Sequence, residues 1–115
     1  MASHHEIQTI ISCFKKDLDN GRCTLQMRRK NEQTLGKLGW RDDYALIHLY
    51  KNLEPVHYVA GPEKAHMLKG QHVAGSIWIF HMLIEKLDVY IKFHFHKDGT
   101  TFISFHESEN REGEE

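Results

Sequence analysis

Apolar residues recur at helical spacing near the start of the chain. They form one stripe that consists of Ile7, Ile10, Ile11, Phe14 and Leu18. Spacings of three and four residues place these side chains on a single face of a helix. Ser3 followed by Glu6 is a capping-box pattern, and Asn20-Gly21 is a typical stop signal. The pattern therefore predicts a helix over about residues 4–19.

Two more helices are predicted before the middle of the chain. Residues 24–27 suit a short extended segment, and a helix follows over about 28–38, where one of two glycines interrupts or ends it. Asp42 can cap a third helix, which Pro55 ends. The residues that this helix turns inward are Ala45, Leu46, Leu49 and Leu53.

The pattern changes from helical to strand-like after Pro62. Residues 61–75 are polar and glycine-rich, which predicts a loop long enough to suggest a function. Three strand-like runs follow, over residues 76–82, 89–96 and 101–106. Helices first and strands afterwards indicate an α+β domain, in which N-terminal helices pack on a small antiparallel sheet.

The last two strands predict a hairpin whose loop length decides which side chains meet. Residues 89–96 alternate strictly, with apolar residues on one face and polar residues on the other. A two-residue loop, Asp98-Gly99, would turn apolar residues of the last strand toward the polar face. A three-residue loop that begins at Lys97, a type I turn with Gly99 as a left-handed bulge residue, keeps the apolar face intact. We therefore predict the three-residue loop.

This register brings three polar residues into one patch. The predicted pairs are Phe93–Ile103, Ile91–Phe105, Tyr90–His106 and Lys92–Ser104. Tyr90, Lys92 and His106 then lie together on the face away from the core. Cleavage of RNA by its own 2′-hydroxyl needs a proton acceptor, a proton donor for the leaving 5′-oxygen, and cations on the phosphate. An imidazole transfers protons near neutral pH, so the patch is a candidate for this chemistry; the alternative is an ordinary solvated sheet face.

The near-neutral charge of the chain divides into two unequal parts. The 115 residues carry a formal net charge of −1. Residues 107–115 hold five acids and one base, a net charge of −4, which leaves +3 on residues 1–106. We expect residues 1–106 to form a single domain and residues 107–115 to be a disordered acidic tail. The densest basic stretch, Arg28, Arg29 and Lys30, is either a solvated face or a contact for a polyanion.

Several function classes are disfavoured by what the composition lacks. The chain has no run of 18 apolar residues and no apolar signal stretch at its N-terminus, so we expect no membrane span and a cytoplasmic protein. Its two cysteines cannot form a disulfide framework or a four-thiolate zinc site. Cys23 lies in a basic neighbourhood, which could lower the pKa of its thiol.

The ten histidines raise the question of a metal site. His94 and His96 form a His-x-His pair on one face of a strand, a spacing that zinc sites use. His66, His72 or His81 could supply a third ligand. Because no carboxylate or cysteine sits at a diagnostic spacing, we expect no metal and no other cofactor. His94 and His96 are then candidates for RNA binding by stacking and partial charge.

The order of motifs over about residues 7–109 resembles a known family. The motifs are Asn20-Gly21-Arg22, Lys37-Leu38-Gly39-Trp40, His57-Tyr58, Gly61-Pro62-Glu63, Ile77-Trp78-Ile79-Phe80, Val89-Tyr90-Ile91-Lys92 and Ile103-Ser104-Phe105-His106-Glu107. Their order and spacing resemble bacterial toxins of the motility quorum-sensing regulator type (MqsR-like), within the wider RelE-like group of small RNases. The resemblance implies the RelE-like RNase toxin fold.

The resemblance also implies an activity and partners. Such proteins are toxins of type II toxin–antitoxin systems, endoribonucleases (mRNA interferases) that cleave mRNA without a metal and arrest growth. The ends expected from this cleavage are a 2′,3′-cyclic phosphate and a 5′-hydroxyl. The implied partners are mRNA and a cognate protein antitoxin, often a DNA-binding protein of the helix-turn-helix type.

Most of the family's site residues can be matched to positions of this chain. The strand tyrosine falls on Tyr90 and the following lysine on Lys92. The family position after the terminal Ser-Phe is His106 here. The glutamine expected on the preceding strand is replaced by Ile79, with His81 nearby.

One catalytic lysine of the family has no direct counterpart. It is expected just after Tyr58, where this chain has Val59. Lys64, or less directly Lys69, could supply that charge from the following loop. The missing lysine and glutamine keep a second hypothesis open, a non-catalytic RNA- or antitoxin-binding module of the same fold. A metal-dependent enzyme is the third.

The predicted site has a catalytic part and an RNA-binding part. His106 is the predicted general acid or base, and Tyr90 would position or deprotonate the 2′-hydroxyl. Lys92 and Lys64 would stabilise the phosphate. The predicted RNA-binding residues are Arg28, Arg29, Lys30, His57, Tyr58, His81, His94 and His96.

Overall fold

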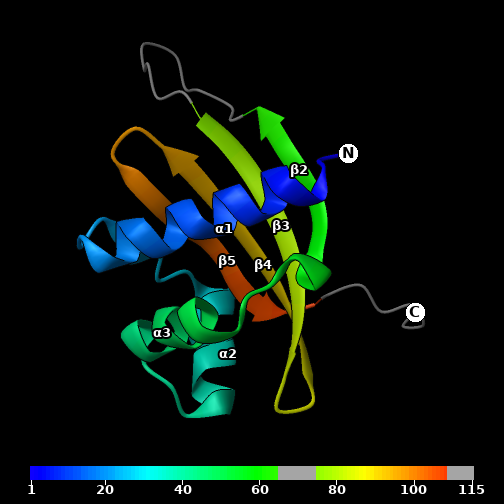
Figure 1. The fold of residues 1–115 in the computed structure, drawn as a ribbon. Helices are drawn as coiled ribbons and strands as arrows, with labels where there is room; N and C mark the ends of the chain where they lie inside the picture. Colours follow the sequence, from blue (N-terminus) through cyan, green and yellow to red (C-terminus); the bar gives the residue numbers. More distant parts are fainter. Residues whose placement is uncertain (65–74, 109–115) are drawn as a thin grey trace.

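The protein is an α+β domain in which helices pack on a five-stranded sheet (Figure 1). The computed structural model describes residues 1–64 and 75–108. The elements are α1 (His4–Asp19), β1 (Cys23–Leu25), α2 (Arg29–Leu38), α3 (Asp42–Asn52), the 3₁₀ turn η1 (Pro55–His57), β2 (Tyr58–Lys64), β3 (Gly75–Ile84), β4 (Leu87–His96) and β5 (Gly99–Glu107). None of the helices within these residues is long and apolar enough to cross a membrane.

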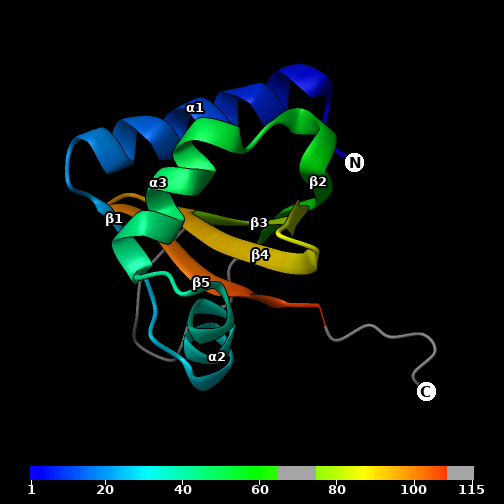
Figure 2. The same ribbon diagram turned by 90° about the horizontal axis from the view of Figure 1, so that it is seen from below.

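The sheet has the strand order β1-β5-β4-β3-β2. β1 pairs with β5 in parallel, and the other neighbours are antiparallel. Figure 2 shows α1 and α3 on one side of the sheet and α2 beside β5. The predicted fold class is therefore confirmed, and α1 has the predicted bounds and capping box: the Ser3 hydroxyl accepts from the Glu6 amide, and the Glu6 carboxylate accepts from the Ser3 amide.

The loop predicted over residues 61–75 is wrong in its first part. Residues 61–64 belong to β2, which forms the edge of the sheet, and the register of β2 with β3 shifts twice. An irregular edge strand tolerates glycine and proline, which the sequence pattern reads as loop residues. Gly61 is required by close packing, since a Cβ there would lie 2.6 Å from the Ile77 carbonyl oxygen. The remainder of the predicted loop, with His66, Lys69 and His72, lies outside the described residues.

The predicted three-residue hairpin loop is also wrong. The loop consists of Lys97 and Asp98, and His96 pairs with Gly99. Gly99 has φ 137°, outside the left-handed helical region, and it is required because a Cβ would lie 2.0 Å from the Arg22 carbonyl oxygen. The short loop thus brings β5 against the start of β1.

A bulge in β5 restores the register that the longer loop would have given. Phe93 pairs with Phe102 in place of the predicted Ile103, and the register then shifts by one residue, leaving Ile103 without a partner in β4. The extra residue lets both Phe102 and Phe105 point into the core, where each is 0% exposed. Beyond the bulge the predicted pairs Ile91–Phe105, Tyr90–His106 and Lys92–Ser104 are all present.

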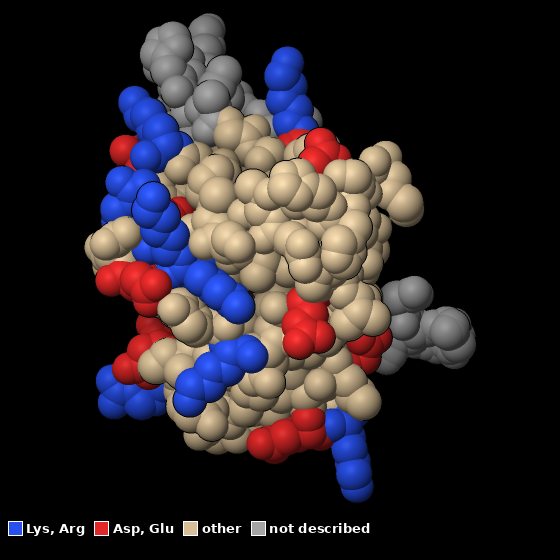
Figure 3. All heavy atoms as spheres, in the orientation of Figure 1, with Lys and Arg blue, Asp and Glu red and all other residues tan. Residues whose placement is uncertain are grey.

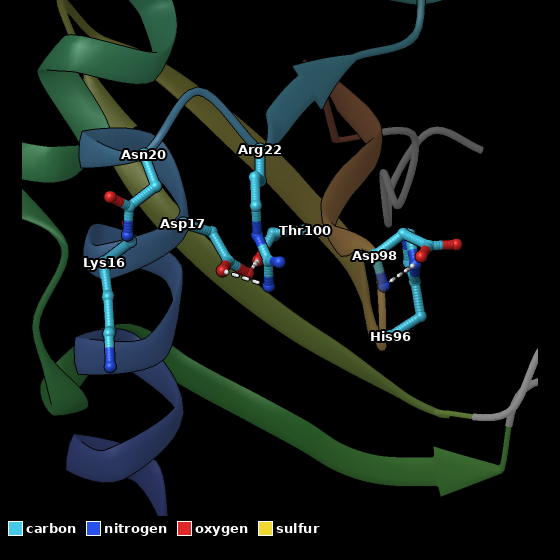
Figure 4. Close-up of polar contacts among 7 residues, drawn as sticks. All are labelled: Lys16, Asp17, Asn20, Arg22, His96, Asp98 and Thr100. Carbon is cyan, nitrogen blue, oxygen red and sulfur yellow. Dashed lines mark hydrogen bonds and ion pairs between the residues drawn. The ribbon is translucent and has the colours of Figure 1, made fainter.

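Asp17 joins α1 to β5 beneath the sheet's parallel edge (Figure 4). This carboxylate is only 5% exposed. Its oxygens accept hydrogen bonds from the Thr100 hydroxyl, at 2.8 Å, and from the Arg22 guanidinium, at 3.4 Å. Because a buried charge needs such partners, these contacts fix the end of α1 on the sheet.

Candidate functional site

Three aromatic rings form a row across the sheet on the face away from α1 and α3. His81 of β3 pairs with Tyr90 of β4, and Tyr90 pairs with His106 of β5. The ring centroids of His81 and Tyr90 are 5.5 Å apart, and those of Tyr90 and His106 are 5.4 Å apart. Side chains alternate between the two faces along each strand, so the sequence neighbours of His81, Tyr90 and His106 point to the opposite, helix-covered face of the sheet. We call His81, Tyr90 and His106 the ring row.

His106 has a defined hydrogen-bond geometry. Its Nδ1 lies 3.0 Å from the Glu107 carbonyl oxygen. A carbonyl oxygen can only accept, so Nδ1 carries the hydrogen and donates it. In the neutral ring Nε2 is then the nitrogen with a lone pair. This tautomer leaves Nε2 able to accept a proton from a substrate.

His81 has a different kind of partner. Its Nδ1 lies 3.3 Å from a carboxylate oxygen of Asp88, on the neighbouring strand. The carboxylate forms an ion pair with the ring when the ring is protonated. The side chains are 33% and 61% exposed respectively, so a ligand on this face can reach them.

Tyr90 lies between the two histidines and is protonated near neutral pH. Burial and the nearby negative charge of Glu63 both raise the pKa of its phenol above the ordinary value. A phenol in this state donates a hydrogen bond but does not remove a proton. Of its two predicted roles, the structure therefore favours positioning over deprotonation.

Lys92 adds a positive charge next to the ring row. It pairs with Ser104 on one side and Ile79 on the other, and it lies two residues from Tyr90 on the same face of β4. That spacing corresponds to about 7 Å along a strand. Lys92 is half-buried, so the stem of its side chain lies against the sheet.

A cavity connects His106 to the basic cluster at the start of α2. Its volume is about 380 Å³. Its lining residues are Arg28, Arg29, Lys30, Asn31, Ile103, Ser104 and His106. The backbone amides of the first turn of a helix also favour anions. The cavity therefore combines cationic side chains and a helix N-terminus within reach of the ring row, and we call it the anion cavity.

Asn31 explains why α2 lies at this position. β1 pairs with β5 only as far as Phe102, so the edge of β5 beyond that point needs another partner. The Asn31 side chain accepts from the Phe105 amide, at 2.9 Å, and donates to the carbonyls of Ile103 and Gln26, at 3.0 and 2.8 Å. Asn31 is 0% exposed. Sequence reasoning missed this residue, because a single asparagine in a polar helix gives no signal of its partner.

Three predicted site residues lie away from the ring row. Tyr58 packs on Trp78 in the core, with ring centroids 6.3 Å apart, and its hydroxyl donates to the Gly61 carbonyl. His57 accepts from the amide of Glu54 within the η1 turn. The Tyr58 hydroxyl also accepts from the Ala2 amide, at 3.2 Å, so it connects β2 to the N-terminus.

Lys64 is the third. It pairs with Ser76 near the far end of β3, five residues before His81, which corresponds to about 17 Å along a strand. The structure therefore does not bring Lys64 to the ring row, and within the described residues Lys92 is the lysine of that sheet face nearest to it in register.

His94 and His96 continue, beyond Lys92, the half-buried face of β4 that carries Tyr90. Their ring centroids are 4.7 Å apart, and His96 Nε2 lies 3.0 Å from the Thr101 hydroxyl. Within residues 1–64 and 75–108 there is no group of three His, Cys, Asp or Glu side chains that could hold a metal ion. These two histidines therefore remain candidates for contacts with RNA bases.

The thiol of Cys23 is not activated by its basic neighbourhood. Burial, and secondarily the charge of Asp17, raise the pKa of this thiol to about 12.

A second cavity lies on the helix-covered side of the sheet, with a volume of about 450 Å³. It is lined by Cys13, Lys16, Asp17, Asn20, Arg22 and Phe95. Figure 3 shows Lys and Arg side chains gathered on the side where the C-terminal end of α1 and the β4–β5 turn lie. In Figure 4 Arg22 points to Asp17. The ion pair between them stabilises the fold. This cavity is separated from the ring row by the sheet.

Comparisons of the chain with family models, with curated proteins and with solved structures found no match.

Proposed function

We propose that the protein is an endoribonuclease that cleaves mRNA by attack of the 2′-hydroxyl on the adjacent phosphodiester. The observation that carries the proposal is the ring row beside the anion cavity. A proton acceptor, a phenolic donor and several cations lie along one exposed face of rigid sheet. Such positioned groups are what phosphodiester cleavage requires.

His106 acts as the general base in this proposal. Its Nε2 takes the proton of the 2′-hydroxyl while the 2′-oxygen bonds to phosphorus and the bond to the 5′-oxygen breaks. Tyr90 donates a hydrogen bond to the phosphate, and Lys92 balances its charge. The leaving 5′-oxygen takes up a proton, so the products are a 2′,3′-cyclic phosphate and a 5′-hydroxyl, and no metal takes part in the step.

RNA on either side of the cleaved bond is held by charge and stacking. Phosphates bind in the anion cavity, through Arg28, Arg29 and Lys30. Bases stack on the half-buried rings of His94 and His96. Lys64, His57 and Tyr58 have no part in this site.

We further propose that the enzyme is the cytoplasmic toxin of a type II toxin–antitoxin system. The support is the resemblance of its motifs to the MqsR-like, RelE-like toxins. A protein antitoxin, DNA-binding and of the helix-turn-helix type, would then neutralise it. An exposed basic site of this kind suits an acidic partner segment.

The test is cleavage of a defined mRNA by the purified full chain, with and without a strong chelator. His106→Gln should abolish cleavage and growth arrest, while the matched control His5→Gln, on exposed α1, should change neither. Tyr90→Phe should reduce cleavage about 10- to 100-fold, because it removes one hydrogen bond to the phosphate. Full activity of His106→Gln would contradict the proposal.

One observation favours the alternative of a non-catalytic binding module. The chain has Val59 where the family has a lysine, and Lys64 lies far from the ring row. Such a module would bind RNA and leave it uncut in buffers both with and without divalent cations.

A further inference from the structure

We propose that His81 is a second catalytic residue, the general acid that protonates the leaving 5′-oxygen. This inference rests on the proposed ribonuclease function and names the group that completes it. His106 and His81 would then divide the two proton transfers of the reaction between them.

The first support is position. His81 and His106 lie on the two outer strands of the β3–β4–β5 unit, with Tyr90 between them and about 5.5 Å from each ring. In an in-line displacement the attacking and leaving oxygens are on opposite sides of phosphorus. A phosphate above Tyr90, with its charge next to Lys92, therefore has one imidazole near each of these oxygens.

The second support is the different partner of each ring. The Glu107 carbonyl accepts from His106 Nδ1, which suits a neutral ring whose Nε2 takes a proton. A carboxylate of Asp88 lies beside His81 Nδ1, which suits a ring that carries protons on both nitrogens. The different partners at Nδ1 therefore suit the two rings to the two different proton transfers.

The third support is that Tyr90 is a poor candidate for the acid. Its pKa is raised by burial and by Glu63, so the phenol gives up its proton less readily than an ordinary tyrosine. Among the described residues of the ring row, His81 is the remaining imidazole, the type of side chain that most often serves as a general acid.

Each proton in the proposed step has a donor and an acceptor. The 2′-oxygen loses its proton to His106 Nε2 and bonds to phosphorus. The bond from phosphorus to the 5′-oxygen breaks, and His81 Nε2 gives that oxygen its proton. His106 leaves the step protonated and His81 neutral, and exchange with water restores both.

The decisive experiment compares two substrates of the same sequence. One is an RNA with the ordinary 5′-oxygen at the cleaved bond, and the other carries sulfur in that position, a leaving group that needs no proton. His81→Gln should lower kcat/KM for the ordinary RNA by about 100-fold or more and leave the 5′-thio substrate within about threefold of the parent. His106→Gln should lose activity on both substrates, and His5→Gln on neither.

The outcomes separate this inference from the proposed function. An equal loss on both substrates for His81→Gln would assign that residue to binding or structure and overturn the inference. Unchanged cleavage of the ordinary RNA by His81→Gln would do the same. Activity that survives in His106→Gln would instead overturn the proposed function, and thermal unfolding of each variant checks that it is folded.

A pH profile gives a second readout. The parent should show a bell-shaped kcat/KM, because the base must be neutral and the acid protonated. His81→Gln should lose the decline at high pH. The other charged groups near the ring row are Asp88 and Lys92 from β4, Glu63 from β2, and Arg28, Arg29 and Lys30 at the anion cavity. An unchanged alkaline limb in His81→Gln would contradict the assignment.

Discussion

Asn31 of α2 bonds to Phe105 of β5 across 74 positions of sequence: its side-chain oxygen accepts the Phe105 amide hydrogen at 2.9 Å. The same amide side chain donates to the Ile103 carbonyl, so it takes the place of a neighbouring strand. This relationship connects the fold to the candidate site. It carries Arg28, Arg29 and Lys30 to the side of His106.

Replacing Asn31 by leucine should destabilise the protein by about 2–4 kcal/mol, because buried backbone groups of β5 lose their partner. Urea unfolding followed by circular dichroism measures this change. Gln33→Leu, at an exposed position of the same helix, is the matched control and should cost less than about 0.5 kcal/mol. Equal effects of the two substitutions would show that the side-chain bonds of Asn31 matter little.

Removing positive side chains from the anion cavity should lower the affinity for RNA and make that affinity depend less on the salt concentration. For single strands, each lost phosphate contact should reduce the slope of log K against log salt by about 0.7. The double substitution R28A/R29A should therefore reduce it by about 1.4 if each arginine meets one phosphate. Fluorescence anisotropy with a 2′-O-methyl RNA, which cannot be cleaved, gives the slope, and Lys51→Ala on exposed α3 should leave it unchanged.

Asp17 and Thr100 should behave as a coupled pair in unfolding experiments. Asp17→Ala should cost about 1–3 kcal/mol, since the Thr100 hydroxyl and the Arg22 guanidinium lose their acceptor. Thr100→Val should cost about 1 kcal/mol. Because the two residues share one hydrogen bond, the double variant should cost less than the sum, and strict additivity would contradict the coupling.

The thiol of Cys23 should be unreactive in the folded protein. A rise of the pKa from 9.0 to about 12 lowers the fraction of thiolate about 1,000-fold near pH 8. In a Cys13→Ser background, alkylation by iodoacetamide should be slow in the native state and ordinary in urea. Comparable rates in the two conditions would place Cys23 at the surface.

The Cys23 thiol also makes the free energy of unfolding depend on pH. The unfolded thiol ionises near its ordinary pKa of 9.0, whereas the folded thiol keeps its proton until about 12. The contribution of Cys23 is therefore present in full below pH 9 and is lost as the pH rises toward 12. The free energy of unfolding of Cys23→Ala should therefore fall less over that pH range than that of the parent. Urea titrations at several pH values would measure both.

Local sequence signals predicted the elements that depend on local interactions. The stripe of α1 and its Ser3–Glu6 cap are contacts within a few residues, so the bounds were predictable. Strand-like runs indicated β3, β4 and β5, and strict alternation marked residues 89–96 of β4. The pairing of Tyr90 with His106 was correct because the apolar face of β4 and β5 constrains it.

Long-range contacts explain what the sequence did not reveal. The bulge at Ile103 depends on burial of Phe102 and Phe105 together, and the two-residue loop depends on the approach of Gly99 to Arg22. The ring row depends on the register of β3 with β4, for which the chain offered no turn signal: Glu85 and Lys86 have positive φ without a glycine. The sequence therefore predicts an RNA contact for His81, but not its pairing with Tyr90 or its side-chain contact with Asp88.

The bulge in β5 makes the length of the hairpin loop independent of the site. With a two-residue loop and one extra residue at Ile103, Tyr90 meets His106; with a three-residue loop and no bulge, it would meet the same residue. Inserting one residue after Asp98 while deleting Ile103 thus keeps Tyr90 paired with His106. A chain with either hairpin keeps the same number of residues between Tyr90 and His106, so the two hairpins align without a gap and the histidine keeps its position in the sequence.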